Sequence, residues 1–398
     1  MERVRLLWLT ENAPPDRGGM SQSCDRIVRS LRGRSIEIDL VHLSRKATEW
    51  NVSTQHMGRL ITVPVDEEPG HALNLLWSML EQNGAGESTT HVVAFGGTLP
   101  LLGAPVLAAW LDRPLVTLLR GNDFDTAIFS IKRRDVLNEA IHRSESVAVV
   151  TRDHEKKVSS LFPDVPLQWI PNGIQLHDWQ VSPGDRERAL RWRAENVAPD
   201  RTVLGMFGHL KQKKGATFFL EALLSTGLAD RFHILIVGEV EASLRSWLDE
   251  RREELPVTIV PFIDRYELIP FYCAADVVAI PSFYDGMPNT LLEAAATGRP
   301  LIASSAGGMS DVLVDGKNAI VFQTGNRDAC RRALDRLSRM DKAEMAILGE
   351  TLKQQIARDF TLDIEADRYE KLLADAATRF SNKEWPRAAL NLVDRRAR

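Results

Sequence analysis

The chain contains few cysteines, lacks a long apolar run and has no large excess of charge of one sign. Its three cysteines, Cys24, Cys273 and Cys330, lie far apart, with no spacing typical of a zinc site. We therefore expect reduced, mostly buried thiols in a cytoplasmic protein. The longest mostly apolar stretch, Leu99 to Leu111, is interrupted by proline and glycine and is shorter than the roughly 20 residues that a membrane-spanning helix needs.

The charge balance argues against nucleic acid as the main partner. The chain has 50 Lys+Arg against 54 Asp+Glu, a formal net charge of -4, whereas nucleic-acid-binding domains are usually strongly basic. The first residues, MERVRLLWLTENAPP, form a short apolar run followed by acidic and proline residues. This pattern does not predict a signal peptide.

Short runs rich in Val, Ile and Leu alternate with helical patterns along nearly the whole chain. This alternation is typical of parallel α/β architecture. The runs form two sets, separated by the charged stretch from Gln175 to Arg201, which we interpret as a boundary or linker because it contains proline and glycine. The expected strands are residues 4–9, 36–41, 91–95, 114–119 and 146–150, then 202–207, 233–237, 257–260, 276–280 and 300–304.

The two sets predict two Rossmann-like parallel-sheet domains that face each other across a cleft. We place the first domain at residues 1–177 and the second at residues 178–370. From Arg327 onward the pattern is helical, and the segment 371–398 ends in a polar, basic tail.

Each half begins with a strand, a glycine-containing turn and a helix, which presents backbone N–H groups to an anion. In the first half, Gly18 and Gly19 precede a helix expected near Gln22 to Leu31. In the second half, three lysines crowd the loop from His209 to Gly215. A plain turn and a solvated loop explain these segments equally well. Neither segment matches GxGxxG or GxxxxGK[ST], which disfavours a dinucleotide dehydrogenase or a P-loop NTPase.

The most informative segment is Pro281 to Pro300, PSFYDGMPNTLLEAAATGRP. A predicted strand ends at Pro281, a loop containing Asp285 follows, and a helix that begins near Asn289 carries Glu293. This spacing places two carboxylates at the ends of a ligand-sized gap, with the backbone N–H groups of the helix start between them. A ligand with hydroxyl groups at both ends and phosphate in the middle fits, and nucleoside diphosphate sugars have this layout.

At these residues the sequence resembles glycosyltransferase family 4, whose members are retaining enzymes of the GT-B fold. The resemblance covers most of the chain and is strongest from Met206 to Phe322. Its most specific feature is the family's E-x(7)-E segment, which appears here as Asp285 to Glu293, followed by Gly298-Arg299-Pro300 and Gly307-Gly308. The resemblance implies a GT-B enzyme whose C-terminal helices pack back on the first domain.

The resemblance also implies roles for individual residues. Glu293 would hold the ribose diol of the donor, Asp285 a hydroxyl of the transferred sugar, and Lys214 corresponds to the lysine of the family's GRLxxxKG loop. The other implied donor-site residues are Gly286, Met287, Pro288, Asn289 and Thr290 beside the diphosphate or sugar, Gly18 and Gly19 in the loop that closes over the site, and Asn172 in IPNGI at the exit from the first domain.

Three positions depart from the family pattern. Asp285 is one methylene shorter than the usual Glu, His209 stands where Arg is usual, and Arg120 stands where many relatives carry a histidine near the reacting groups. Arginine cannot act as a base, but it binds a phosphate or carboxylate bidentately. We expect Lys214, His209, Asp285 and Arg120 to form the catalytic set.

We expect no metal and no cofactor, since the nucleotide sugar is the substrate and GT-B enzymes generally need no metal. Asp123-Phe124-Asp125 forms a D-x-D triplet, the metal signature of a different glycosyltransferase fold, but such triplets arise easily by chance.

The leading hypothesis is a retaining glycosyltransferase that uses a UDP-sugar or, next, a GDP-sugar. Its acceptor would be a hydroxyl of a polysaccharide, a lipid-linked sugar or a small natural product. A nucleotide-sugar epimerase of the same fold and a non-catalytic nucleotide-sugar-binding protein are the alternatives. The basic groups Lys132-Arg133-Arg134 and Arg395, Arg396 and Arg398 could dock on the inner face of a membrane, although a solvated surface is the preferred interpretation. Nothing in the sequence indicates an oligomeric state.

Overall fold

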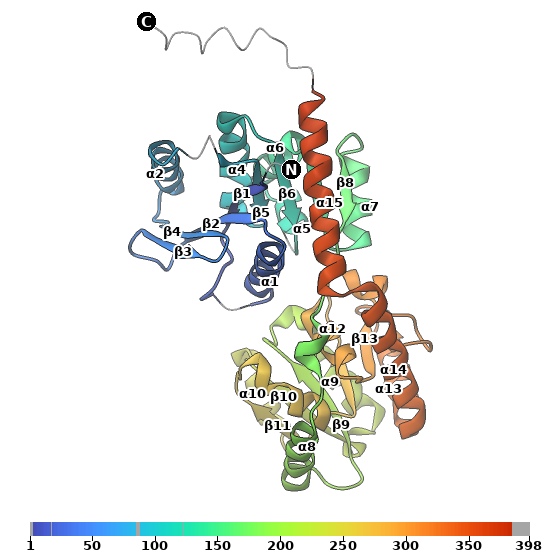
Figure 1. Ribbon diagram of the computed structural model, residues 1–398. Helices are drawn as coiled ribbons and strands as arrows, with labels where there is room; N and C mark the ends of the chain where they lie inside the picture. Colours follow the sequence, from blue (N-terminus) through green and yellow to red (C-terminus); the bar gives the residue numbers. More distant parts are fainter. Residues whose placement is uncertain (1–2, 17, 85–87, 122, 384–398) are drawn as a thin grey trace, which may run out of the picture.

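The computed structural model describes residues 3–16, 18–84, 88–121 and 123–383, and Figure 1 shows them as two α/β domains, one above the other. The first sheet has eight strands in the order β3-β4-β2-β1-β5-β6-β7-β8, and the second has six in the order β11-β10-β9-β12-β13-β14. Among the described residues, the pairings are parallel except that of β3 with β4. The predicted fold class, two parallel-sheet α/β domains, is confirmed.

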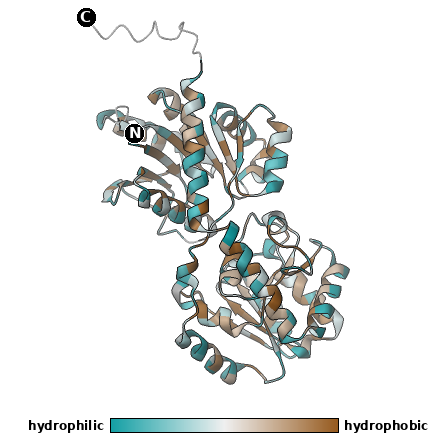
Figure 2. Ribbon diagram, turned by 45° about the vertical axis from the view of Figure 1, so that its right-hand side comes forward, coloured by the Kyte–Doolittle hydropathy of each residue, from teal (hydrophilic) through white to brown (hydrophobic). Residues whose placement is uncertain are grey.

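The strands are short and mostly buried, as expected for parallel sheets that helices cover on both faces. Figure 2 shows hydrophobic residues concentrated on the strands and on the inner faces of the helices. The strands are β1 (Arg5–Thr10), β2 (Glu37–Ser44), β3 (Asn51–Gln55), β4 (Gly58–Pro64), β5 (His91–Phe95), β6 (Leu115–Leu119), β7 (Ser146–Val149), β8 (Leu167–Trp169), β9 (Thr202–Phe207), β10 (Phe232–Val237), β11 (Val257–Val260), β12 (Val277–Ile280), β13 (Leu301–Ser304) and β14 (Ile320–Phe322).

The helices lie between the strands and after the last one. In the first domain they are α1 (Gly19–Gly33), α2 (Pro69–Gln82), α4 (Thr98–Leu111), α5 (Asp123–Ile128), α6 (Arg134–Arg143) and α7 (Arg152–Leu161). From the second half of the chain come α8 (Pro183–Asn196), α9 (Ala216–Thr226), α10 (Ala242–Glu250), α11 (Ile269–Ala274), α12 (Asn289–Ala296), α13 (Arg327–Arg339), α14 (Lys342–Asp359) and α15 (Leu362–Ser381).

Every strand expected from the sequence overlaps an observed strand, but four strands were missed. The β3 strand, NVSTQ, is polar and nearly fully exposed, so it has no apolar pattern to detect. It pairs antiparallel with β4, which is half-buried. The β8 and β14 strands are only three residues long.

The stretch from Gln175 to Arg201, interpreted as a boundary or linker, contains a full helix and is therefore not an unstructured linker. Pro183 lies at the first turn of α8, where its missing N–H costs nothing. Ser182 and Asp185 form a capping box there, because the Ser182 hydroxyl accepts from the Asp185 N–H and the Asp185 carboxylate accepts from the Ser182 N–H. Proline and glycine therefore mark a helix start here and not a break.

The helical pattern expected from Arg327 onward is confirmed as far as Ser381, and the last long helix returns to the first domain. Figure 1 shows α15, in red, running alongside the first sheet. Tyr369 and Leu372 are buried in the same core cluster as Leu6 and Trp8 of β1. The Leu373 carbonyl lies 3.0 Å from His91 Nε2. The basic residues Arg395, Arg396 and Arg398 lie outside the described residues.

Two features of the topology position the functional loops. In the first sheet the strand order reverses between β1 and β5, and in the second between β9 and β12. Such switch points, at the carboxyl ends of the strands, are where open α/β sheets bind ligands. In the described part of the chain, no helix is both long and apolar enough to cross a membrane.

Candidate functional site

The switch point of the second sheet brings Lys214 and Asp285 together. Lys214 ends the short turn η2 (Gln212–Lys214) after β9, and Asp285 lies in the loop after β12. The Lys214 ammonium forms an ion pair with the Asp285 carboxylate. The next residue, Gly215, has a φ of +67°, and a Cβ there would lie 2.2 Å from the Pro281 carbonyl oxygen. Glycine at 215 is therefore required for the close approach of the two loops.

Glu293 lies on α12, one turn after the helix start, and contacts a buried tyrosine. The Tyr272 hydroxyl donates a 2.7 Å hydrogen bond to Glu293 Oε2. The Tyr272 ring stacks on Phe207, the last residue of β9, with 4.0 Å between ring centroids. Burial raises the pKa of the Glu293 carboxyl above its ordinary value, and the hydrogen bond from Tyr272 offsets only part of that effect. Tyr272 therefore donates a hydrogen bond to an acid whose charged form burial disfavours, and a further hydrogen-bond donor would stabilise that charged form.

A pocket of about 580 Å³ opens beside these loops, at the carboxyl ends of β9, β10 and β11. His209 lines it from the β9 side, Gly238 and Glu239 from the β10 side, and Pro261 and Phe262 from the β11 side. The His209 Nδ1 atom lies 3.3 Å from Glu239 Oε2. The volume suits a nucleoside-sized ligand. His209, predicted as a member of the catalytic set, lies at this pocket beside the acid Glu239.

The loop between Asp285 and α12 is held by contacts from both sides. The Gly286 carbonyl accepts a 2.7 Å hydrogen bond from the Gly308 N–H, and the Met287 carbonyl accepts one of 2.7 Å from Asn172 Nδ2. Pro288 is the N-cap of α12, and Asn289 and Thr290 are its first two residues. The sequence assigned residues 286–290 to the donor site, and in the structure they form the turn that leads from Asp285 into α12.

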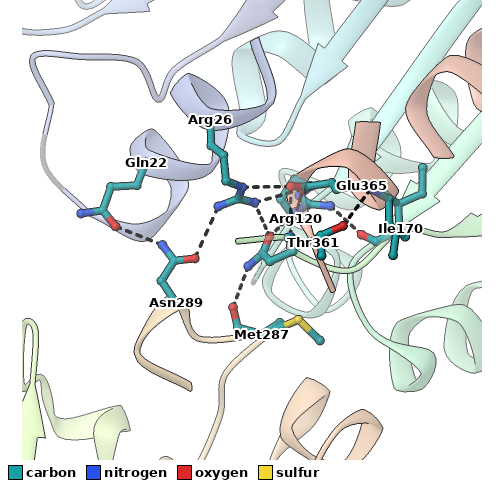
Figure 3. A network of polar contacts seen from close by, with 11 residues as sticks. Gln22, Arg26, Arg120, Ile170, Met287, Asn289, Thr361 and Glu365 are labelled. Carbon is teal, nitrogen blue, oxygen red and sulfur yellow. Dashed lines mark hydrogen bonds and ion pairs between the residues drawn. The ribbon is translucent and has the colours of Figure 1, made fainter. Parts of the chain in front are cut away.

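A polar network joins this turn to the first domain and to α15 (Figure 3). Arg26 on α1 is its centre: its Nε and Nη2 atoms donate to Glu365 at 2.9 and 3.0 Å, and Nη2 also donates to Asn172 Oδ1 at 2.8 Å. The Asn289 amide donates to Gln22 Oε1 at 3.0 Å, one helical turn before Arg26. The helices α1 and α15, the segment at Asn172 and the turn before α12 therefore meet at the Glu365 carboxylate and the Asn172 amide.

Arg120 and Asn172 lie within this network. The Arg120 side chain is 1% exposed; its guanidinium donates to the Ile170 carbonyl at 2.8 Å and to the Asn172 side chain, and lies 3.5 Å from Glu365. Its Nε atom is buried without a partner in the described residues. Both side chains, predicted to touch the ligand, are engaged in linking the domains. Arg120 therefore makes these contacts within the protein, and its role at the reacting groups stays a prediction.

Gly18 and Gly19 lie at the start of α1, and Gly18 has a φ of +125°. One turn further on, Gln22 contacts Asn289 at the start of α12. This turn was predicted to close over the donor site. In the structure, the Gln22 side chain of α1 makes the contact with the start of α12.

The acids of the D-x-D triplet are engaged by the protein itself. Asp123 accepts hydrogen bonds of 3.1 Å from the N–H groups of Gly97 and Arg120. Asp125 lies 2.7 Å from His154 Nε2, and His154 also lies 3.3 Å from the hydroxyl of Tyr284, next to Asp285. Within the described residues, no group of three or more His, Cys, Asp or Glu side chains could hold a metal ion. The triplet therefore helps to fix the first domain against the donor loop.

Sequence reasoning missed Arg26, Glu365 and Tyr272. Arg26 and Glu365 are 339 positions apart in the chain, and no local pattern connects them. Tyr272 follows Pro270 and Phe271 in an apolar run that is typical of buried core residues. The signal that could have found Arg26 is its spacing of four residues from Gln22 on the helix after Gly18-Gly19.

Two doubly wound domains, with acidic and basic residues at the switch point of the second, define the GT-B class of glycosyltransferase folds. Comparison with solved structures agrees. Sucrose-phosphate synthase from Thermosynechococcus elongatus superposes with a TM-score of 0.78 at 17% identity, over 94% of this chain and 98% of that one. Anabaena HepE, in complex with UDP and glucose, superposes with a TM-score of 0.72 at 18% identity, over 93% and 99%.

The sequence of the second domain resembles that of known glycosyltransferases. Residues 201–340 match the model of the family Glycosyl transferases group 1. An uncharacterized glycosyltransferase of Methanocaldococcus jannaschii is 26% identical over 214 residues, 50% of this chain and 54% of that protein. The matched stretch thus spans about half the length of this relative. The predicted resemblance to glycosyltransferases is confirmed.

Proposed function

We propose that the chain is a retaining glycosyltransferase of the family 4 type, which transfers a hexose-type sugar from a nucleoside diphosphate sugar to a hydroxyl acceptor. The observation that carries this proposal is the pairing of Lys214 with Asp285 at the switch point of the sheet whose loops also carry the pocket at His209 and the acid Glu293. A UDP-sugar is the favoured donor and a GDP-sugar the next; the complex of Anabaena HepE with UDP and glucose supports the first choice.

Each part of such a donor has a matching group. The pocket lined by His209 and Phe262 would take the nucleoside, and Glu293 would accept hydrogen bonds from the ribose hydroxyls. Lys214 would bind the diphosphate together with the N-terminal end of α12, because an ammonium and a helix start both favour negative charge. Asp285 would then exchange its contact with Lys214 for a hydroxyl of the sugar.

The reaction we propose needs no protein nucleophile. The bond from the sugar's anomeric carbon to the diphosphate breaks, and the acceptor oxygen forms a bond to the same face of that carbon. The acceptor proton passes to an oxygen of the departing diphosphate. The protein's contribution is positioning and stabilisation of the charge that builds on the diphosphate, chiefly by Lys214. We propose that no metal is required, so activity should survive EDTA.

Two alternatives to a glycosyltransferase would be distinguished by what happens to the donor. A nucleotide-sugar epimerase would isomerise the donor without any acceptor, and a non-catalytic binding protein would hold the nucleotide without consuming the donor. Proton NMR of a reaction with UDP-glucose and a mixture of polysaccharide, lipid-linked and small-molecule acceptors separates the three. The proposal requires free UDP and a new glycosidic bond of the same anomeric configuration as the donor.

The raised pKa of Glu293 gives a pH dependence that can be measured. The ribose hydroxyls would bind the carboxylate and not the neutral acid, so donor binding should release a proton wherever the pH lies near or below the pKa of this carboxyl. Affinity for a nucleotide sugar should therefore fall on acidification below the raised pKa, by up to about tenfold per pH unit. Calorimetric titration at several pH values measures this trend. Glu293→Gln should bind more weakly and with no such trend; an unchanged pH profile in that variant would remove Glu293 from the ribose site.

A further inference from the structure

The connection between α5 and α6 exposes two large apolar side chains at its tip. Phe129 is 90% and Ile131 is 91% exposed, more than any other large hydrophobic side chain in the described parts of the chain. Single exposed apolar residues are common on proteins. Two such residues, separated by one serine and almost fully in solvent, gain nothing from the fold as it stands. Their exposure therefore favours a role in contacting something other than the rest of this chain.

Three basic residues follow the apolar pair directly. Lys132, Arg133 and Arg134 are all exposed. Asp135 lies 4.0 Å from Arg134, and an ion pair this long between exposed side chains contributes little in water. This cluster is locally positive in a chain whose formal net charge is -4. We call residues 129–134 the apolar-basic loop.

The apolar-basic loop lies on the side of the first domain that faces the candidate site. It follows α5, which begins after the carboxyl end of β6, and Figure 1 shows α5 at the edge of the first domain nearest the second. Asp125 on α5 contacts His154, which in turn contacts Tyr284 beside Asp285. Leu102 and Val106, exposed one turn apart on α4, add apolar surface on a helix that packs against α6. The loop thus borders the region through which an acceptor would reach the donor.

We propose that the apolar-basic loop docks on an anionic lipid bilayer, with Phe129 and Ile131 inserted at the headgroup boundary and the three cations against lipid phosphates. Insertion of apolar groups together with a basic cluster is the combination that gives stable but reversible membrane contact. Each basic residue near an anionic surface strengthens binding by about fivefold. A protein partner fits less well, because a specific interface covers about 800 Å² per partner and two protruding side chains on a short loop offer far less.

Docking on a bilayer would indicate which class of acceptor the enzyme uses. A loop that holds the first domain on a bilayer beside the candidate site favours an acceptor hydroxyl carried on a lipid over a soluble polysaccharide or a small natural product. This step rests on the proposed function. The docking itself does not, because it depends only on the loop.

Flotation of the whole chain with vesicles tests the docking. We expect binding to vesicles of phosphatidylcholine with 30% phosphatidylglycerol, at least tenfold weaker binding to phosphatidylcholine alone, and a loss of binding at high salt. The double variant Phe129→Ser/Ile131→Ser and the double variant Lys132→Glu/Arg133→Glu should each weaken binding at least tenfold. The matched control is Arg332→Glu/Ile347→Ser, which changes an exposed cation and an exposed apolar residue on α13 and α14.

The outcomes separate this inference from the proposed function. Nucleotide-induced thermal stabilisation, measured in the same variants, should not change, because the loop does not line the donor pocket. The docking would be overturned if the wild-type chain bound neither kind of vesicle, even if it bound nucleotide. It would also be overturned if the loop variants bound vesicles as well as the wild type does. A loop variant that instead breaks a dimer in gel filtration would also overturn it, in favour of a protein interface. Vesicle binding without any nucleotide binding would leave the docking standing and contradict the proposed function.

Discussion

Replacement of Lys214 by alanine lowers kcat about a hundredfold or more, and has little effect on folding. In the structure this lysine is the cation at the switch point, paired with Asp285 and held next to Gly215. Loss of one preorganised group that stabilises transition-state charge typically costs about 10²- to 10³-fold in kcat. Both side chains of the pair are partly exposed, so the ion pair itself contributes little to the free energy of unfolding. Steady-state kinetics with the identified donor and thermal unfolding of the same variant measure the two effects.

The matched control for this prediction is Lys317→Ala, which removes an exposed lysine from a surface turn of the same domain. It should retain wild-type kcat. Lys214→Arg should recover part of the activity, because it restores the positive charge with a different geometry. If Lys214→Ala turned over at a near-normal rate, the lysine could not carry the role assigned to it.

Replacement of Glu365 by alanine lowers the free energy of unfolding by about 3 to 5 kcal/mol, the cost typical of removing one partner from a buried ion pair. The Glu365 side chain is 2% exposed and accepts hydrogen bonds from Arg26 and from the N–H of Gly173. Without it, Arg26 and Arg120 are left close together in the protein interior with no anion between them. Urea denaturation followed by circular dichroism measures the change.

The control is Glu370→Ala, on the same helix. Glu370 pairs with Arg34 at 3.3 Å but is 41% exposed, so its removal should cost less than about 1 kcal/mol. A Glu365→Ala variant as stable as Glu370→Ala would contradict the view that this network holds α1, α15 and the donor loop together.

The sequence was informative where the structure depends on local pattern. Runs such as HVVAF and LVTLL predicted buried strands, because a parallel sheet covered on both faces requires continuous apolar sequence. The loop and helix from Asp285 to Glu293 were also predictable, since a strand, a turn and a helix start follow one another within one short segment. The ion pair of Lys214 with Asp285 joins two segments that were each singled out from sequence.

The sequence was not informative where distant segments meet. Arg26 and Glu365 have no shared pattern, and only the return of α15 to the first domain brings them together. For the same reason no local pattern indicates that the side chains of Arg120 and Asn172 bond to each other and to this network. The β3 strand was missed because an exposed strand of polar residues lacks the apolar alternation that identifies strands.

The central claim is that the second domain binds a nucleoside diphosphate between its pocket, Lys214 and Glu293. The most direct measurement is thermal unfolding of the wild type and of Glu293→Ala with UDP, GDP, ADP and dTDP in turn. A nucleotide at 100 times its Kd should add about 2.7 kcal/mol to the stability of the folded state. We predict a rise in Tm with UDP in the wild type that is lost in Glu293→Ala. No rise with any of the four nucleotides, or an equal rise in both proteins, would contradict the account.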